Sequence, residues 1–386
     1  MIETKSIAIV GGGIGGLTLA IALRRKGVHA IVYEGAPVLR PVGAGIVLAG
    51  NAIKAFEAIG LDAVVKAEGN EIKKFSLKDK TGHLLSAVSA DSMHGDSRFI
   101  NSVALHRADL QQLLVSQLPA EVIKLNKSCV SFKQTQNGVD LTFHDGSTQT
   151  HDYVIAADGI HSVFRNTLVP DRTLRYSGYT CWRGVVSSEN LASNVNEAAE
   201  FWGAGKRFGV VPLSSNRLYW YATIDAIQRD PKLEHRSPND LIDLFSDFHQ
   251  IVREVLQAAA AGTTIKGDIS DIKPLKKFAF GNIVLLGDAA HSSTPNLGQG
   301  ACMAIEDAVV LAQCINADGN VVEAFQEFER KRLERTTKIV NASYALGKLG
   351  QLKNPVLVKL RNAMMKWTPK QVSRRQLEFL HDISFK

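Results

Sequence analysis

A glycine-rich turn near the start of the chain constrains its fold more than any other feature. Residues 6–10 form a short apolar run that predicts a buried strand, and the sequence GGGIGG follows directly at 11–16. The next segment predicts a helix that ends in basic residues, and residues 29–33 predict a second strand that closes with Glu34. Strand, turn, helix and strand within about 30 residues make a βαβ unit, which is almost always right-handed. The sequence therefore predicts an α/β fold here.

The chemistry of this turn indicates what it binds. Gly11 permits a tight turn, Gly13 lets the backbone approach a pyrophosphate, and Gly16 lets the helix pack on its strand. The helix N-terminus would face the phosphates with its partial positive charge, and Glu34 can accept hydrogen bonds from ribose hydroxyls. A glycine triplet also occurs in ordinary turns, but this context predicts a dinucleotide site. The motif alone does not separate NAD from FAD.

Two further motifs follow predicted strands later in the chain. The first is DGIHSVFR at 158–165, and the second is GDAAH at 287–291, which continues into Pro295 and the GQG triplet at 298–300. A carboxylate at a strand end before a glycine-rich helix start can hold a polyol chain and a second pyrophosphate contact. Either motif alone is equally typical of an ordinary strand-to-helix loop. All three motifs in this order are very hard to produce by chance, so they favour a nucleotide site.

The order of patterns along the chain predicts its organisation. Buried-strand and glycine motifs lie at both ends, whereas the middle alternates apolar, polar and aromatic residues in the manner of a β-sheet. We predict a nucleotide-binding domain at 1–172, with a small inserted strand segment at about 70–100, that resumes at 276–320. A β-sheet domain of α+β class at 173–275 interrupts it, and a helical segment at 321–386 follows. Predicted helices include 51–69, 107–118, 239–259 and 299–315.

Composition and charge exclude several functions. The 386 residues include 45 Lys and Arg against 38 Asp and Glu, a net charge of +7. Residues from 320 onward hold 14 basic and 6 acidic residues, so the rest is nearly neutral and we expect no nucleic-acid partner. The four cysteines form no C-x-x-C pair, so we expect neither a disulfide framework nor a metal site. No targeting signal or membrane span is evident, and we expect a cytoplasmic protein.

The basic end of the chain has two interpretations. Residues 353–386 hold 8 basic and 2 acidic residues. Apolar side chains are interleaved with them at Val356, Leu357, Leu360, Met364, Met365 and Trp367. Such a segment either touches an anionic membrane surface or packs on the protein as an amphipathic helix with a solvated basic face. We expect the packed helix.

Taken together, the three motifs resemble those of the FAD-dependent single-component aromatic hydroxylases. These are the class A flavoprotein monooxygenases with the para-hydroxybenzoate hydroxylase fold, and the resemblance extends from residue 7 to about 307 by motif and further by layout. The stretches PVGAGI, HRADL, SGYTCWRG and GKRFGVVP are most similar to the branch with urate hydroxylases, salicylate hydroxylases and zeaxanthin epoxidases. The resemblance implies a Rossmann-type FAD-binding domain, an inserted β-sheet substrate domain and a helical C-terminal segment.

The resemblance implies non-covalent FAD and assigns residues to it. Glu34 would bind the adenosine ribose, Arg107 the ribityl or phosphate portion, and Asp288 the ribityl chain. Asp158 and Arg165 would help to bind FAD and reduced nicotinamide together, because the family lacks a separate nicotinamide domain. The implied cofactor-binding residues are Gly11, Gly13, Ile14, Gly15, Gly16, Glu34, Gly35, Val47, Arg107, Cys129, Val130, Asp158, Gly159, Arg165, Gly287, Asp288, Pro295, Gly298, Gln299, Gly300 and Ala301.

The implied reaction is a hydroxylation. NADH or NADPH would reduce FAD, O₂ would add to it as a C4a-hydroperoxide, and an aromatic or heteroaromatic, acidic small molecule would receive one oxygen. Arg207 would orient the anion, although a strand-end arginine is the plain alternative. Arg183 stands where urate hydroxylases carry an asparagine, which puts urate in doubt and leaves a hydroxybenzoate as suitable. The candidate catalytic residues are Arg207, Tyr219 and Pro295, and the candidate substrate contacts are Arg183, Arg207, Tyr219 and Tyr221.

Other functions of the same fold stay open at this point. A flavoprotein reductase or saturase would consume NAD(P)H without activating oxygen, and a binding protein could keep FAD only as structure. A halogenase is disfavoured because the chain has no W-x-W-x-I-P element. His291 lies in a tempting place beside the third motif, but packing and hydrogen bonding are its expected role.

Overall fold

One half of the molecule is built on a mostly parallel sheet. The computed structural model describes residues 5–39, 44–89, 102–192, 197–316, 319–368, 378–380 and 383–385. Within them, six strands pair in the order β18 (Ala279–Phe280), β19 (Ile283–Leu285), β12 (Tyr153–Ala156), β1 (Ile7–Val10), β2 (Ala30–Tyr33) and β8 (Ile123–Lys124). All neighbours are parallel except β18 and β19. The central strand β1 is buried throughout, as its apolar sequence predicts.

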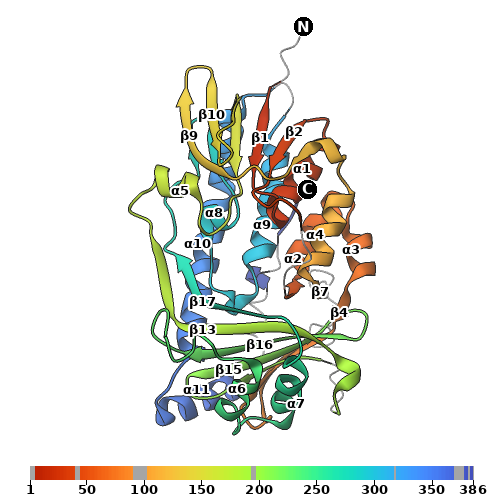
Figure 1. Ribbon diagram of the computed structural model, residues 1–386, viewed down its shortest axis with the longest axis vertical. Helices are drawn as coiled ribbons and strands as arrows, with labels where there is room; N and C mark the ends of the chain where they lie inside the picture. The colour runs from red at the N-terminus through yellow and green to blue at the C-terminus, as the bar shows by residue number, and fades with distance from the viewer. Residues whose placement is uncertain are drawn as a thin grey trace.

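Helices cover this sheet and carry its glycine loops. Helix α1 (Ile14–Arg25) follows β1 and packs against α9 (Gly300–Cys314), which runs beside the 30-residue helix α10 (Val321–Gly350). Figure 1 shows these helices alongside β1 and β2. The remaining helices of this half are α2 (Gly50–Ala58), α3 (Asp62–Glu68), α4 (Arg107–Ser116), α5 (Val163–Leu168) and α8 (Asp288–His291), with 3₁₀ turns at Ala120–Val122 and Pro295–Leu297. The predicted helix 51–69 is two helices, because Gly60 has a φ of +62° and breaks it.

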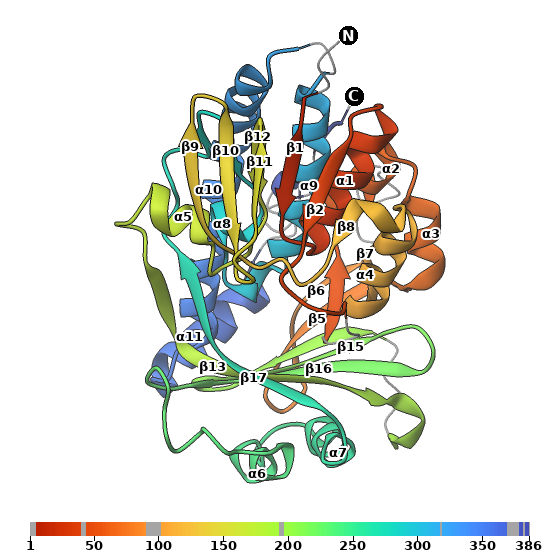
Figure 2. The same ribbon diagram turned by 45° about the horizontal axis from the view of Figure 1, so that its top comes forward.

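The other half is built on a seven-stranded sheet. Its strands pair in the order β17 (Thr264–Ile272), β13 (Leu174–Ser187), β16 (Arg217–Asp225), β15 (Lys206–Pro212), β14 (Ala198–Trp202), β5 (Lys74–Asp79) and β6 (Leu84–Ser89). Helices α6 (Pro238–Leu244) and α7 (Gln250–Ala259) lie across its outer face (Figure 2). The single helix predicted at 239–259 is therefore two helices. A 3₁₀ turn, Ser188–Asn190, follows β13. The alternation predicted for the middle of the chain is confirmed.

The strand segment expected at about 70–100 belongs to this second sheet. Strand β5 pairs parallel with β14, and β6 pairs antiparallel with β5, so the segment extends the edge of the seven-stranded sheet. Residues 90–101 lie outside the described residues. Two small sheets complete the fold, β11 (Thr148–His151) with β10 (Gly138–Phe143) and β9 (Cys129–Thr135), and β3 (Gly45–Leu48) with β7 (Ser102–His106) and β4 (Asn70–Ile72). Spatial pairing, which sequence order does not reveal, places β5 and β6 away from the sheet of their neighbours.

Helix α11 (Pro355–Trp367) turns its apolar side chains outward, whereas we expected them to pack on the protein. It buries Arg361, which is 1% exposed, whereas Leu360 is 65% and Trp367 is 80% exposed. The expectation that its apolar side chains pack on the protein is therefore wrong, because a buried arginine occupies the inner face. Among the described residues, no helix is both long and apolar enough to cross a membrane.

Candidate cofactor and active site

The glycine turn after β1 has the geometry that a phosphate-binding loop requires. Gly11 has a φ of +114°, and a Cβ built there would lie 2.2 Å from the carbonyl oxygen of Ala157. A Cβ on Gly16 would lie 2.0 Å from the carbonyl oxygen of Gly11, so only glycine lets α1 begin this close to the strand. A Cβ on Gly13 would meet no described heavy atom within 4 Å. Gly13 thus faces open space at the start of a helix.

That open space is a cavity of about 400 Å³ at the carboxyl ends of β1, β2 and β12. Seven residues predicted to bind cofactor line it, namely Gly11, Gly13, Glu34, Gly35, Cys129, Asp158 and Gly159. Its other lining residues are Val10, Tyr33, Lys127, Ser128, Ala157, His161 and Val163. Sequence reasoning missed Lys127 and Ser128, which lie just before β9, and His161 inside the second motif. Open α/β sheets bind ligands at this edge of the sheet.

The carboxylate of Glu34 organises the rim of the cavity. One oxygen accepts a hydrogen bond from the backbone N–H of Gly12 at 2.7 Å, and the other accepts one from Ala36 at 2.8 Å. Each oxygen keeps a free lone pair, since a carboxylate accepts about four hydrogen bonds. Glu34 is therefore held in a fixed orientation with capacity left for ribose hydroxyls.

The second motif contributes residues both to the cavity wall and to the scaffold around it. One carboxylate oxygen of Asp158 accepts from the N–H of Val163 at 2.8 Å, while the other is buried without a partner among the described residues. Burial raises the pKa of Asp158. Arg165 is 1% exposed and donates to the carbonyl oxygens of Ile160 and Asp288, so it joins the second motif to the third. Asp158 lines the cavity and keeps one carboxylate oxygen without a partner among the described residues.

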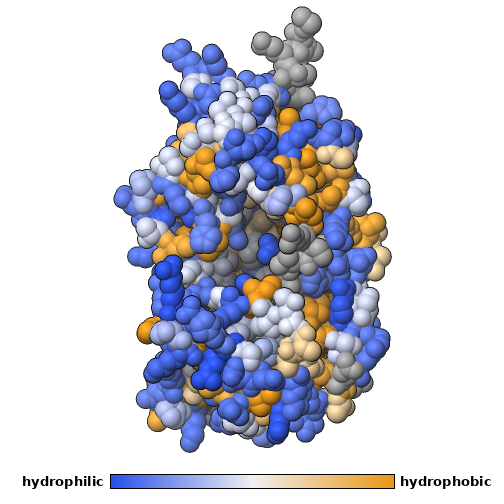
Figure 3. All heavy atoms as spheres, in the orientation of Figure 1, coloured by the Kyte–Doolittle hydropathy of each residue, from blue (hydrophilic) through white to orange (hydrophobic). Residues whose placement is uncertain are grey.

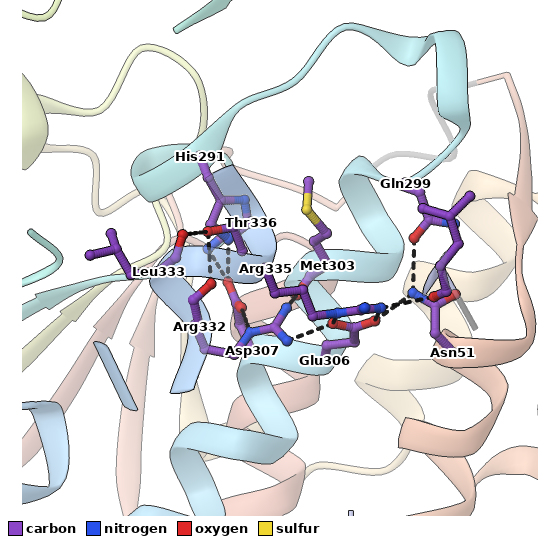
Figure 4. A network of polar contacts seen from close by, with 12 residues as sticks. Asn51, His291, Gln299, Met303, Glu306, Asp307, Arg332, Leu333, Arg335 and Thr336 are labelled. Carbon is purple, nitrogen blue, oxygen red and sulfur yellow. Dashed lines mark hydrogen bonds and ion pairs between the residues drawn. The ribbon is translucent and has the colours of Figure 1, made fainter. Parts of the chain in front are cut away.

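A buried charge network supports the third motif. His291 Nε2 lies 2.6 Å from Asp307, whose other oxygen accepts from Arg332 Nε at 2.6 Å. Arg332 also pairs with Glu306 at 2.6 Å, and Glu306 pairs with Arg335 at 2.7 Å. Figure 4 shows how these side chains reach from α8 across α9 to α10. His291 makes the kind of hydrogen bond that the sequence analysis expected of it in this loop.

The same network extends to the GQG loop. Asn51, at the start of α2, donates to Glu306 at 2.5 Å and to the side chain of Gln299 at 2.8 Å (Figure 4). Asp307 additionally accepts from the backbone N–H of Gly287 at 3.0 Å. Because the network bonds directly to both Gly287 and Gln299, it fixes the two loops relative to each other.

The remaining residues predicted to bind cofactor do not line the cavity. The carboxylate of Asp288 is exposed, and the charge of Arg107 reaches it from the first residue of α4. Pro295 begins a 3₁₀ turn that ends at Gly298, whose φ is +64°. Gly300 and Ala301 start α9, and Val47 lies in β3 with its carbonyl oxygen beside Cys302. Ile14, Gly15, Gly16 and Gly287 are buried by packing, and Val130 is 47% exposed on β9.

Arg207 is buried and binds side chains of the protein itself. Its side chain is 3% exposed and lies 3.3 Å from the carboxylate of Glu200 on the neighbouring strand. It also donates to the side-chain oxygen of Asn296 at 2.7 Å, and the hydroxyl of Tyr179 donates to that same oxygen at 3.1 Å. Asn296 follows Pro295, so Arg207 ties the seven-stranded sheet to the turn after the third motif.

The other candidate substrate residues share the same face of the sheet. Tyr219 and Tyr221 are two residues apart on β16, with ring centroids 5.7 Å apart, and Arg183 on β13 is paired with Tyr221. Tyr219 packs against Gly45 of β3, and the ring of Tyr221 lies over Gly209. Burial raises the pKa of both tyrosine hydroxyls, which therefore stay protonated near neutral pH. Arg183 is half-buried and has no hydrogen bond or ion pair within the described residues.

This face lies opposite the loops of the first half. The surface is hollowed between the two halves in the view of Figure 3. Tyr219 contacts β3 and Arg207 contacts the turn after the third motif, so the predicted residues of the two halves meet there. The arrangement suits a cofactor whose nucleotide end lies in the cavity and whose ring reaches the sheet.

Comparison with known proteins decides the family. The family model described as FAD binding domain matches residues 3–343. The chain belongs to this family. It is 35% identical over 380 residues to aurachin C monooxygenase/isomerase of Stigmatella aurantiaca, covering 97% of this chain and 98% of the relative. It is 34% identical to 2-heptyl-3-hydroxy-4(1H)-quinolone synthase of Pseudomonas aeruginosa, covering 96% of each chain.

A solved structure gives the same result. HpxO of Klebsiella pneumoniae, complexed with FAD and uric acid, matches with a TM-score of 0.87 and 27% identity, covering 97% of this chain and 96% of that one. The resemblance, the fold class and the FAD cofactor predicted from sequence are confirmed. The family model supplies the FAD-binding domain, and relatives that match over most of the chain are named monooxygenases or FAD-dependent hydroxylases, so the protein is an FAD-dependent monooxygenase.

The described residues fit FAD. The cavity has an open glycine at a helix N-terminus for a pyrophosphate, an anchored carboxylate with spare lone pairs for a ribose, and an unpartnered buried oxygen on Asp158. Cys129 also faces it, and burial, together with the charge of Asp158, raises the pKa of its thiol to about 11. This cysteine is therefore a neutral wall of the cavity and no nucleophile.

Proposed function

We propose that the protein uses NADH or NADPH and O₂ to hydroxylate a neutral, planar heteroaromatic ring of the oxo-quinoline type. The observation that carries the proposal is the pairing of Arg207 with Glu200 in the interior. A buried carboxylate pairs with this arginine and weakens its attraction for an anionic substrate. Arg183 has free donors, which suit one oxo or phenolic oxygen.

The apolar surroundings and the relatives support a neutral ring. Tyr219 packs in a cluster with Val47, Ala104 and Val211, and Tyr221 packs with Tyr179 and Ile269. Two relatives at 35% and 34% identity have names that specify aurachin C and a 2-heptyl quinolone, and both match along nearly the whole chain. Flat aromatic side chains beside aliphatic ones favour a ring with an apolar substituent over urate or a hydroxybenzoate.

The assignment of FAD to individual residues is part of this proposal. The N-terminus of α1 and Gly13 hold the pyrophosphate, Glu34 holds the adenosine ribose, and Asp288 with Arg107 holds the ribityl portion. When bound, FAD supplies hydride acceptance and oxygen activation. The chain itself binds and orients both partners, and the sheet face excludes water from the reacting ring.

Turnover assays test the proposed reaction. FAD-loaded protein is followed by NADH and NADPH oxidation with parallel oxygen uptake, against a 2-alkyl-4-quinolone, urate, salicylate, hydroxybenzoates and kynurenine. The alkylquinolone is expected to accelerate oxidation and to yield one hydroxylated product per NAD(P)H consumed. Acceleration by a carboxylate or urate alone would refute the neutral-ring proposal. Oxidation without oxygen uptake would indicate a reductase.

Asp288→Ala is expected to weaken FAD binding about 10–100-fold, because a hydrogen bond to a charged acceptor contributes ~1.5–3 kcal/mol. Asp288 is exposed in the described structure, so its removal leaves no packing defect. Flavin fluorescence titration of the apoprotein measures the dissociation constant, and Asp140→Ala on strand β10 is the control. Unaltered affinity in Asp288→Ala would remove this residue from the cofactor site.

Arg183→Gln is expected to weaken substrate binding, whereas Arg207→Gln is expected to lower the stability of the protein. Arg183→Gln raises the KM for the substrate about 10–100-fold with FAD content and Tm retained, because it removes a partly exposed, unpaired cation. Arg207→Gln lowers stability by ~3–5 kcal/mol, because it leaves Glu200 buried without its partner. Steady-state kinetics and thermal unfolding measure the two effects. A raised KM at unchanged Tm in Arg207→Gln would identify Arg207 as the substrate arginine instead.

A further inference from the structure

Helix α11 carries an apolar stripe that faces away from the protein. Val356, Leu360, Met364 and Trp367 recur at spacings of four, four and three residues, which places them on one side of a helix. Their exposed fractions are 72%, 65%, 52% and 80%, and Leu357 beside them is 46% exposed. Large apolar side chains scattered singly on a surface are ordinary, but a continuous stripe of five marks an interaction site.

The inner face of α11 explains why the stripe cannot turn inward. The guanidinium of Arg361 donates to the carbonyl oxygens of Gly350 at 3.1 Å and Gly203 at 3.4 Å, and it lies 5.1 Å from the ring centre of Trp202. Asn354 caps the helix by accepting from the N–H groups of Val356 and Leu357. These contacts fix the rotation of the helix about its own axis, so the apolar stripe on the opposite side faces the exterior.

The charged residues of α11 itself are all positive. Lys359 and Lys366 lie on the helix next to it, are exposed, and have no acidic partner within the described residues. Between Glu334 and Glu378 the sequence contains no acidic residue. Of the described basic residues of that stretch, Arg335, Lys338 and Lys353 pair with Glu306, Glu334 and Asp225, and Arg361 is buried. The exposed positive charges that border the apolar stripe on its own helix are therefore Lys359 and Lys366.

We propose that α11 docks this protein on an anionic lipid surface. A helix that inserts Leu, Met and Trp side chains below the headgroups while flanking lysines meet lipid phosphates has this composition. Trp367, the most exposed member of the stripe, is the residue type enriched at the membrane–water boundary. The anchor is peripheral, since the helix has 13 residues and lies along the surface.

A second copy of the chain fits the stripe less well. In a two-fold dimer the same patch meets itself, so the lysine borders of the two copies would lie near each other without acidic residues between them. Like charges that face each other across an interface oppose association. The charge pattern favours an anionic partner, and the proposal is independent of the substrate.

Vesicle co-flotation of the full-length, FAD-loaded protein tests the proposal. The wild type is expected to bind vesicles of phosphatidylcholine and phosphatidylglycerol in equal parts, to ignore pure phosphatidylcholine, and to release in high salt. Leu360→Ser and Trp367→Ser are each expected to weaken binding about ten-fold. Lys359→Gln and Lys366→Gln are each expected to weaken it about five-fold. Val64→Ser is the matched control, because Val64 is 45% exposed on α3, in the other half of the molecule.

Each alternative result overturns the proposal in its own way. All these side chains are exposed, so FAD content and Tm are expected to stay at wild-type values and to exclude misfolding as the cause. Failure of the wild type to float with anionic vesicles contradicts lipid docking. A wild-type dimer in light scattering that becomes a monomer in Leu360→Ser, without vesicle binding, assigns the stripe to a second copy. An equal loss in Val64→Ser shows that binding depends on general hydrophobicity and not on α11.

Discussion

Gly13→Val is expected to abolish FAD retention while leaving the fold intact. The position has an ordinary extended backbone, with a φ of −76°, and a Cβ there would meet no described atom within 4 Å. Valine therefore causes no clash in the apoprotein, but its methyl groups fill the space at the N-terminus of α1 that lines the 400 Å³ cavity. A pyrophosphate could then no longer approach the backbone N–H groups of the helix.

Gly16→Val is the matched comparison, because it lies three residues away and fails for a different reason. Its Cβ would lie 2.0 Å from the carbonyl oxygen of Gly11, so α1 must move away from β1 and the protein is expected to lose stability. Absorbance of the purified proteins measures bound flavin, and circular dichroism with thermal unfolding measures the fold. A yellow Gly13→Val protein with full flavin occupancy would refute the assignment of this loop to the pyrophosphate.

The cofactor cavity was predictable because its residues act locally. Gly11, Gly13 and Gly16 owe their identity to one strand–turn–helix crossover, and Glu34 and Asp158 follow strands that neighbour β1 in the sheet. Parallel pairing brings the carboxyl ends of such strands together, so the glycine turn, Glu34 and the second motif converge without knowledge of any other contact. Seven predicted residues accordingly line one cavity.

The substrate side was less predictable because it depends on pairings between distant segments. The partners of Arg207 are Glu200 on the adjacent strand and Asn296, which is 89 residues away, and neither contact has a local signature. The face that α11 turns outward likewise depends on Trp202, Gly203 and Gly350 around Arg361. A hydrophobic pattern indicates that a helix has two faces, but its neighbours decide which face is covered.

Arg332→Met is expected to destabilise the protein by ~3–5 kcal/mol. Arg332 is 1% exposed and lies 2.6 Å from both Glu306 and Asp307, which are fully buried. Methionine fills similar volume, so the cost comes from two carboxylates that lose a shared cation in the interior. Because Asp307 also holds His291 and the N–H of Gly287, the variant is expected to bind FAD more weakly as well.

The pH dependence distinguishes this charge effect from a packing defect. Asp307 is buried, and the charges of His291 and Arg332 hold its pKa at about 2, below the ordinary value of 3.8. A lowered pKa contributes stability that is present above 3.8 and is lost as the pH falls through 2. In Arg332→Met the pKa of Asp307 rises, so Asp307 takes up its proton at a higher pH than in the wild type. Protonation removes the unpaired buried charge, and the difference in unfolding free energy between wild type and variant therefore becomes smaller in acid. Arg330→Met, at an exposed position of the same helix, is expected to change stability by less than ~0.5 kcal/mol. Urea unfolding across the acid range measures both variants, and a deficit in Arg332→Met that stays constant with pH would attribute it to packing alone.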